Sequence, residues 1–131
     1  VDAHGQTRAA DVFALGDCTE YATPEGTRVL PYIAPLMTAA RAIARTLNGQ
    51  PTAIELTPAP VIVKTPSCPL ALLPPPVAAD GRWHATQYGE RTVCRFHDEA
   101  GVVQGFGVVP QDAGIRQSLL AELGTVFDAA A

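Results

Sequence analysis

Proline dominates the middle of the chain and limits what it can fold into. Seven of the 12 prolines fall between residues 58 and 76, including the run at 74–76. Proline lacks a backbone N–H and clashes inside a helix, so it excludes long helices and central strands from this stretch. Only residues 61–64, Val-Ile-Val-Lys, favour a short strand, at a sheet edge or in a crossover. The chain is therefore divided into three zones, residues 1–50, 51–80 and 81–126.

The first zone is predicted to alternate strand, loop and helix. Residues 12–16 form a short apolar run that ends in Gly16-Asp17, as a buried parallel strand does at a functional edge. The segment 18–29 is rich in Thr, Pro and Gly and is predicted to be a loop.

A helix is the clearest element of this zone. Apolar side chains recur at i, i+4, i+7, i+8 and i+11, namely Leu36, Ala40, Ile43, Ala44 and Leu47. Pro35 suits the first helical turn, and Asn48-Gly49 suits a left-handed end. Arg41 and Arg45 fall on the polar side, where we expect solvent to cover them.

The last zone has the pattern of an antiparallel meander closed by a helix. Turn residues separate three alternating runs, 82–88, 92–97 and 102–109. Asp112 is expected to cap a final helix, and residues 129–131 are expected to fray. The apolar face of that helix comprises Ile115, Leu119, Leu120 and Leu123. The sequence thus predicts an α+β fold: a short strand, a loop and an amphipathic helix, then a small antiparallel β-meander with a C-terminal helix.

Charge and cysteine content argue against several classes of function. The 131 residues carry a net charge of −4 and a single lysine, which argues against nucleic acid or a membrane surface as partner. Cys18, Cys68 and Cys94 are odd in number and widely spaced, so a zinc site or disulfide framework is not expected and the reducing cytoplasm is the default. No run approaches the ~20 apolar residues that would span a bilayer. The three histidines, His4, His84 and His97, lack ligand spacing, and no metal site is predicted.

One place in the first zone is suited to binding a cofactor. Asp17 follows the apolar run directly, and a carboxylate there can accept hydrogen bonds from sugar-like hydroxyls. The helix start near Pro35 offers unpaired backbone N–H groups and a positive dipole end to a carbonyl or anion. The alternative is that Gly16-Asp17 simply makes a turn.

A long motif at the same place resembles a known signature. Thr7 and the run Asp-Val-Phe-Ala-Leu-Gly-Asp at 11–17 match T-x-x-x-[DN]-[VI]-[FYW]-A-x-G-D, the second FAD-binding signature of pyridine-nucleotide-dependent flavoprotein oxidoreductases. Residues 30–35, the Ala-rich helix and residues 60–66 resemble the C-terminal third of the rubredoxin reductase branch. The resemblance is strong to about Pro69 and looser through the meander.

The resemblance implies roles for individual residues. It places Gly16, Asp17, Pro35 and Leu36 at FAD, with Asp17 on the ribityl chain and the helix start near the pyrimidine end of the flavin. Lys64 would approach the flavin or an acidic partner, although a solvated strand residue is the alternative. NAD(P)H would be the electron donor and a rubredoxin-like carrier the acceptor, and no catalytic residue is assigned.

We expect the chain to be the C-terminal portion of a longer reductase, because it lacks the G-x-G-x-x-G that this family needs for FAD and for the nicotinamide nucleotide. Residues 1–50 would complete an FAD-binding domain, and 51–131 would form the C-terminal domain with a Pro-rich entry. The chain alone is expected to be inactive and could oligomerise through an exposed strand edge. Two alternatives stay open: another acceptor (ferredoxin, oxygen or a nitrite reductase partner), or a cofactor-free protein-interaction module.

Two further surface features are candidates for partner contact. Arg82, Arg91 and Arg95 could gather on one face of the meander as a basic docking patch. Trp83 is expected to be a core or docking aromatic residue.

Overall fold

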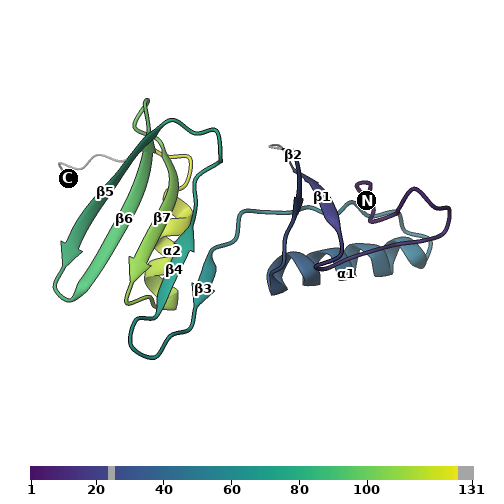
Figure 1. Cartoon of the computed structure of the whole chain (residues 1–131), viewed down its shortest axis with the longest axis horizontal. Coiled ribbons are helices and arrows are strands. Elements are labelled where there is room, and N and C mark those ends of the chain that lie inside the picture. Colours follow the sequence, from purple (N-terminus) through teal and green to yellow (C-terminus); the bar gives the residue numbers. More distant parts are fainter. Residues whose placement is uncertain (24–25, 127–131) are drawn as a thin grey trace. The chain divides into compact units, whose positions relative to one another are not determined.

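The computed structural model describes residues 1–23 and 26–126, which divide between Ala59 and Pro60 into two units (Figure 1). Each unit is described by itself below. Residues 129–131, which were expected to fray, lie outside the described residues.

The first unit holds a β-hairpin followed by a helix (Figure 1). Strands β1 (Glu20–Thr23) and β2 (Gly26–Val29) pair antiparallel, with Tyr21 opposite Arg28. The prediction of a loop over 18–29 is therefore wrong. Tyr21 is only 2% exposed, and its burial anchors strands whose Thr, Pro and Gly content resembles that of a loop.

The run at residues 12–16 does not form the predicted strand. Only Phe13 makes a bridge, an antiparallel one to Gln6. Asp11 adopts a left-handed backbone with φ of 61° and turns the chain back, so that Ala14 donates to the carbonyl of Gly5 at 3.0 Å. Since a strand needs a paired neighbour along its length and this segment meets only the short stretch of residues 5–7, it stays irregular.

Helix α1 (Ile33–Leu47) begins after Tyr32 and carries Pro35 in its first turn, as predicted. At its end Asn48 donates from Nδ2 to the carbonyl of Ala44 at 2.7 Å.

The buried face of α1 is rotated from the predicted one. Its buried residues are Ala39, Ala42 and Ile43, whereas Ala44 and Leu47 are exposed. Gly5 explains the rotation, because a Cβ there would lie 2.5 Å from Cδ1 of Ile43. The bare backbone of Gly5 lets the chain pack directly on this face of the helix.

The second unit is a five-stranded antiparallel sheet in the order β3-β4-β7-β6-β5. The strands are β3 (Val61–Val63), β4 (Leu70–Leu73), β5 (Gly81–Tyr88), β6 (Arg91–Asp98) and β7 (Val103–Val109). The meander is confirmed, and β3 lies at a sheet edge, one of the two places predicted. Strand β4 was not predicted, because prolines flank its four residues on both sides.

Helix α2 (Ala113–Glu122) covers one face of this sheet (Figure 1). Leu119 is 1% exposed and packs with Phe106, Val108 and Ala71 in a core that Ile115, Leu120 and Leu123 extend. The predicted apolar face of the helix and the α+β fold class are therefore confirmed. Within the described residues, the second unit has no further helix to cover the opposite face of the sheet.

Candidate functional site

The corner at Gly16 lies against the first turn of α1. Gly16 has a left-handed backbone with φ of +82°, and its N–H donates to Oη of Tyr21 at 2.8 Å. A Cβ on Gly16 would lie 3.3 Å from Cδ1 of Leu36, so the two residues are in close contact. The structure thus brings Gly16 and Asp17 beside the start of the helix that carries Pro35 and Leu36.

Groups suited to a polar ligand remain open at this corner. The Asp17 side chain is exposed and has neither a hydrogen bond nor an ion pair within the described residues. Tyr32, the N-cap of α1, makes no side-chain cap, and Pro35 has no N–H to offer. The N–H groups of Ile33 and Ala34 are therefore the donors at this helix end.

This set of groups fits the chemistry of a flavin nucleotide. A carboxylate accepts hydrogen bonds from a chain of hydroxyls such as the ribityl chain, and helix-end N–H groups donate to a carbonyl such as those of the pyrimidine ring. Tyr21 was missed by the sequence reasoning, although it holds the Gly16 corner. The only sequence feature that could have pointed to this contact is an aromatic residue five positions after Gly16.

Lys64 belongs to the second unit. It is exposed and follows β3 directly. Of the five residues assigned to cofactor binding, the structure brings together the four in the first unit.

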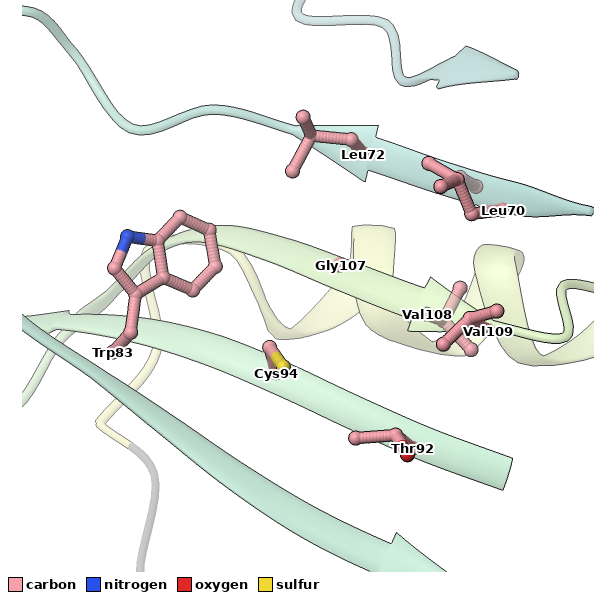
Figure 2. Close-up of a pocket in the computed structure, with 9 residues that line it drawn as sticks. Leu70, Leu72, Trp83, Thr92, Cys94, Gly107, Val108 and Val109 are labelled. Carbon is pink, nitrogen blue, oxygen red and sulfur yellow. The ribbon is translucent and has the colours of Figure 1, made fainter. Parts of the chain in front are cut away.

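The second unit carries an apolar groove on the sheet face opposite α2 (Figure 2). Its volume is about 340 Å³. It is lined by Leu70, Ala71, Leu72, Trp83, Thr92, Cys94, Gly107, Val108 and Val109, and none of these residues is charged. We call it the sheet groove.

Trp83 is the largest side chain of the sheet groove. It is 46% exposed, and its ring meets that of Phe96 edge to face at a centroid distance of 5.5 Å. Gly107 leaves the floor open, because a Cβ there would only touch Leu72 and Cys94 at 3.7 and 3.8 Å. Apart from Trp83, the sequence reasoning missed this face, which the alternation within 82–109 could have shown.

The prediction of a basic docking patch on the meander is wrong. Arg95 is 8% exposed and binds Glu122 of α2, while Arg91 pairs with Asp112 at 2.9 Å. The three arginines share a side of the meander by alternation, but α2 packs on that side, and its N-cap Asp112 and its last residue Glu122 neutralise two of them. Arg82 is exposed.

The histidines and cysteines do not assemble a reactive centre. His84 and His97 stack across β5 and β6 at a centroid distance of 4.9 Å, and burial together with His84 and Arg95 lowers the pKa of His97. All three cysteines are free thiols. The described part of the chain holds no group of His, Cys, Asp and Glu that could bind a metal ion. Likewise, none of the described helices is long and apolar enough to cross a bilayer.

Comparison with protein families identifies the second unit. The family model described as the rubredoxin binding C-terminal domain matches residues 53–123, more than half of the chain. The chain belongs to this family. The matched residues include every strand of the five-stranded sheet, all of α2 and the whole sheet groove.

Reductases that contain a similar sequence extend the similarity from the rubredoxin binding domain into the first unit. The chain is 36% identical over 118 residues to Rubredoxin-NAD(+) reductase of Acinetobacter baylyi, covering 90% of this chain and 29% of the relative. It is 37% identical over 112 residues to Nitric oxide reductase FlRd-NAD(+) reductase of Escherichia coli, covering 86% and 28%. The chain thus spans about a third or less of the length of the relatives that it matches.

Two solved structures share the fold. A NAD-dependent persulfide reductase from A. fulgidus matches with a TM-score of 0.72 at 14% identity, over 97% of this chain and 28% of that protein. NADH:rubredoxin oxidoreductase from Clostridium acetobutylicum matches with a TM-score of 0.65 at 16% identity, over 98% and 33%.

Proposed function

We propose that this chain is the C-terminal portion of a flavoprotein reductase that moves electrons from NAD(P)H through FAD to rubredoxin or a similar small carrier. The observation that carries the proposal is the match of residues 53–123 to the rubredoxin binding C-terminal domain. Relatives named Rubredoxin-NAD(+) reductase, 34–36% identical over about nine-tenths of the chain, support the same activity.

The first unit would hold part of the FAD. Asp17 would accept hydrogen bonds from the ribityl hydroxyls, and the start of α1 near Pro35 and Leu36 would face the pyrimidine end. Gly16 would keep the corner narrow, because any larger side chain would press on Leu36. Bound FAD would accept a hydride from NAD(P)H and release electrons one at a time. The positive end of the α1 dipole would stabilise negative charge on the reduced cofactor.

Lys64 would act from the second unit. It is the only lysine of the chain, and an exposed ammonium group can pair with an acidic partner or with a reduced flavin. The cysteine content supports the cytoplasm as the location of the protein, because free thiols persist in a reducing compartment.

One observation favours a second acceptor. Relatives named Nitric oxide reductase FlRd-NAD(+) reductase are as similar to this chain as the rubredoxin reductases are. A component of a nitric oxide reductase system is therefore the alternative acceptor, with the same donor and cofactor.

The test uses the complete natural polypeptide that contains this chain. We expect it to purify with the absorbance of bound FAD and to reduce rubredoxin when NADH or NADPH is added. Ferredoxin and oxygen serve as competing acceptors in the same assay. A protein that binds no flavin would support the interaction-module alternative. A flavoprotein that reduces ferredoxin or oxygen but not rubredoxin would overturn the proposed acceptor.

A further inference from the structure

The sheet groove lies on the face of the second unit's sheet that does not pack against α2. One face of the sheet packs on α2 and builds the core, with Phe106 fully buried there. Within the described residues, the second unit has no other helix to cover the opposite face, which carries Leu72 and Trp83 (Figure 2). These two residues are 39% and 46% exposed. Apolar surface gathered in one hollow is typical of an interaction site.

We propose that the sheet groove is the surface on which the rubredoxin-like carrier docks. This inference rests on the proposed function, because it takes the carrier from there and assigns its contact surface. The uncharged apolar lining fits a carrier whose own docking surface is apolar at its centre.

The location of the sheet groove favours this occupant. The model of the rubredoxin binding C-terminal domain matches residues 53–123, and all nine residues that line the sheet groove fall within 70–109. The other large exposed apolar side chains of the described second unit lie outside the lining. They are Ile62, Val63, Val77, Tyr88 and Val126. The outer surface of α2 offers small and polar residues, such as Gly114 and Ser118, rather than an apolar anchor.

The chemistry of the lining suits a transient electron-transfer complex. Such complexes bury little area and must dissociate after each transfer, so an uncharged apolar centre with one large anchor is sufficient. Trp83 provides the anchor, since Phe96 supports its ring from the side while almost half of its surface stays exposed. Gly107 leaves room beside it for a side chain of the carrier.

The test measures rubredoxin binding by the complete natural polypeptide, with oxidised rubredoxin as the probe. Trp83→Ser removes the anchor, and Gly107→Val fills the floor of the sheet groove while keeping Trp83. We expect either change to weaken rubredoxin binding about tenfold or more. The rate of electron transfer from NADH to ferricyanide, a small acceptor that needs no docking surface, should be unchanged. Val77→Ser, at an 82% exposed residue outside the lining, is the matched control and should bind as the unaltered protein does.

The outcomes separate the inference from the proposed function. If the unaltered polypeptide neither binds nor reduces rubredoxin, the proposed function fails. If it binds rubredoxin and both variants bind equally well, the carrier docks elsewhere and the inference is overturned while the proposed function stands. If the variants lose flavin or ferricyanide activity together with binding, the sheet groove packs against another part of the reductase, which also overturns the inference. Should Trp83→Ser fail to fold, Gly107→Val decides alone.

Discussion

Arg95 on β6 and Glu122 in the last turn of α2 form a two-point ion pair between sheet and helix. Nε lies 2.6 Å from Oε2, and Nη2 lies 3.0 Å from Oε1. The Arg95 side chain is only 9% exposed, and its hydrogen bonding to Glu122 raises the pKa of Arg95 above its ordinary value. The pair therefore holds the end of α2 on the sheet and keeps the covered face closed.

Removing the carboxylate should destabilise the second unit. Glu122→Ala leaves a largely buried guanidinium without its anion, and we expect the free energy of unfolding to fall by about 2–4 kcal/mol. Urea unfolding followed by Trp83 fluorescence measures this, because the chain has one tryptophan and it lies in the second unit. The double variant Arg95→Met/Glu122→Leu should recover much of the loss. A Glu122→Ala variant as stable as the unaltered chain would show that the pair contributes nothing.

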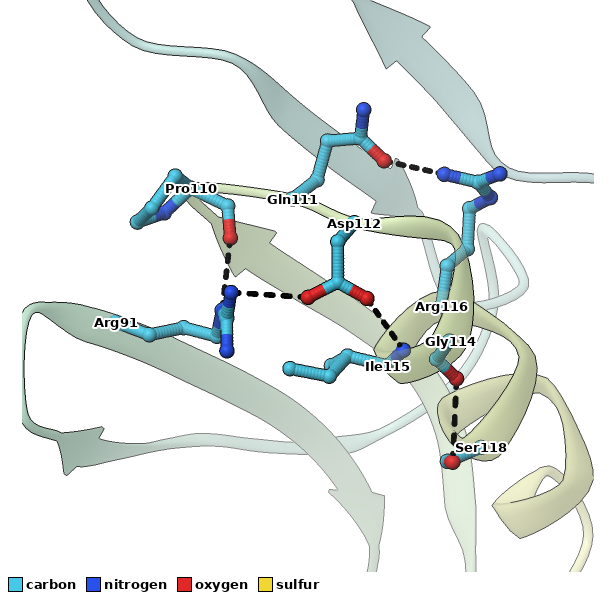
Figure 3. A network of polar contacts seen from close by, with 8 residues as sticks. All are labelled: Arg91, Pro110, Gln111, Asp112, Gly114, Ile115, Arg116 and Ser118. Atoms are coloured by element: carbon cyan, nitrogen blue, oxygen red, sulfur yellow. Dashed lines mark hydrogen bonds and ion pairs between the residues drawn. The ribbon is translucent and has the colours of Figure 1, made fainter.

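The start of α2 depends on Asp112, which makes two contacts (Figure 3). One oxygen accepts the N–H of Ile115 at 2.9 Å, and the other pairs with Arg91, whose Nε also donates to the carbonyl of Pro110 at 3.0 Å. Asp112→Ala should cost about 1–2 kcal/mol through the lost cap. Asp112→Asn keeps an acceptor for the cap and weakens only the exposed ion pair, so it should cost less than 1 kcal/mol. Equal losses in the two variants would mean that the ion pair, rather than the cap, holds this corner.

The stability of the second unit should fall as the solution becomes acidic. The lowered pKa of His97 means that the unfolded chain, with a value near 6.5, takes up a proton more readily than the folded chain does. The stability that neutral His97 contributes to the folded state is fully present above about pH 6.5. It is lost as the pH falls from that value through the lower pKa of His97 in the folded chain. Thermal unfolding between about pH 8 and about pH 5.5 tests this, and His97→Gln should flatten the profile. Asp98 does not interfere, because its lowered pKa acts only below 3.8.

The meander and its closing helix could be predicted because their signals are local. Gly89-Glu90 and residues 98–101 mark the turns, and the side chain of Asp112 caps α2 as its position suggested. Strand β4 could not be predicted, because prolines flank its four residues and one of its partner strands, β7, is distant in the sequence. The hairpin β1–β2 was missed although its pairing is local, because its Thr, Pro and Gly residues are typical of a loop.

The details of the candidate sites depend on packing that the sequence does not show. The buried side of α1 follows from the contact of Ile43 with Gly5, 38 residues earlier. Gly16-Asp17 was found from its motif, but its contact with Leu36 and its bond to Tyr21 are visible only in the structure. Arg95 looked like a surface residue because its partner lies 27 positions away.

Replacing Asp17 should weaken FAD binding without unfolding the first unit. The side chain is exposed and has no partner within the described residues, so Asp17→Ala should change stability by less than about 0.5 kcal/mol. If the carboxylate accepts hydrogen bonds from ribityl hydroxyls, its loss should cost about 1.5–3 kcal/mol of FAD binding, roughly a tenfold to hundredfold change. Fluorescence titration of the flavin-free complete polypeptide with FAD measures the affinity.

Two further variants make the assignment of Asp17 specific. Asp17→Asn keeps an acceptor oxygen without the charge and should bind FAD with intermediate affinity. Gly16→Ala should weaken FAD binding for a different reason: its Cβ meets Leu36 and its backbone is left-handed, so it also lowers the stability of the first unit by about 1 kcal/mol. If Asp17→Ala retains FAD as tightly as the unaltered protein while Gly16→Ala loses it, Gly16 only shapes the corner and Asp17 does not bind the cofactor.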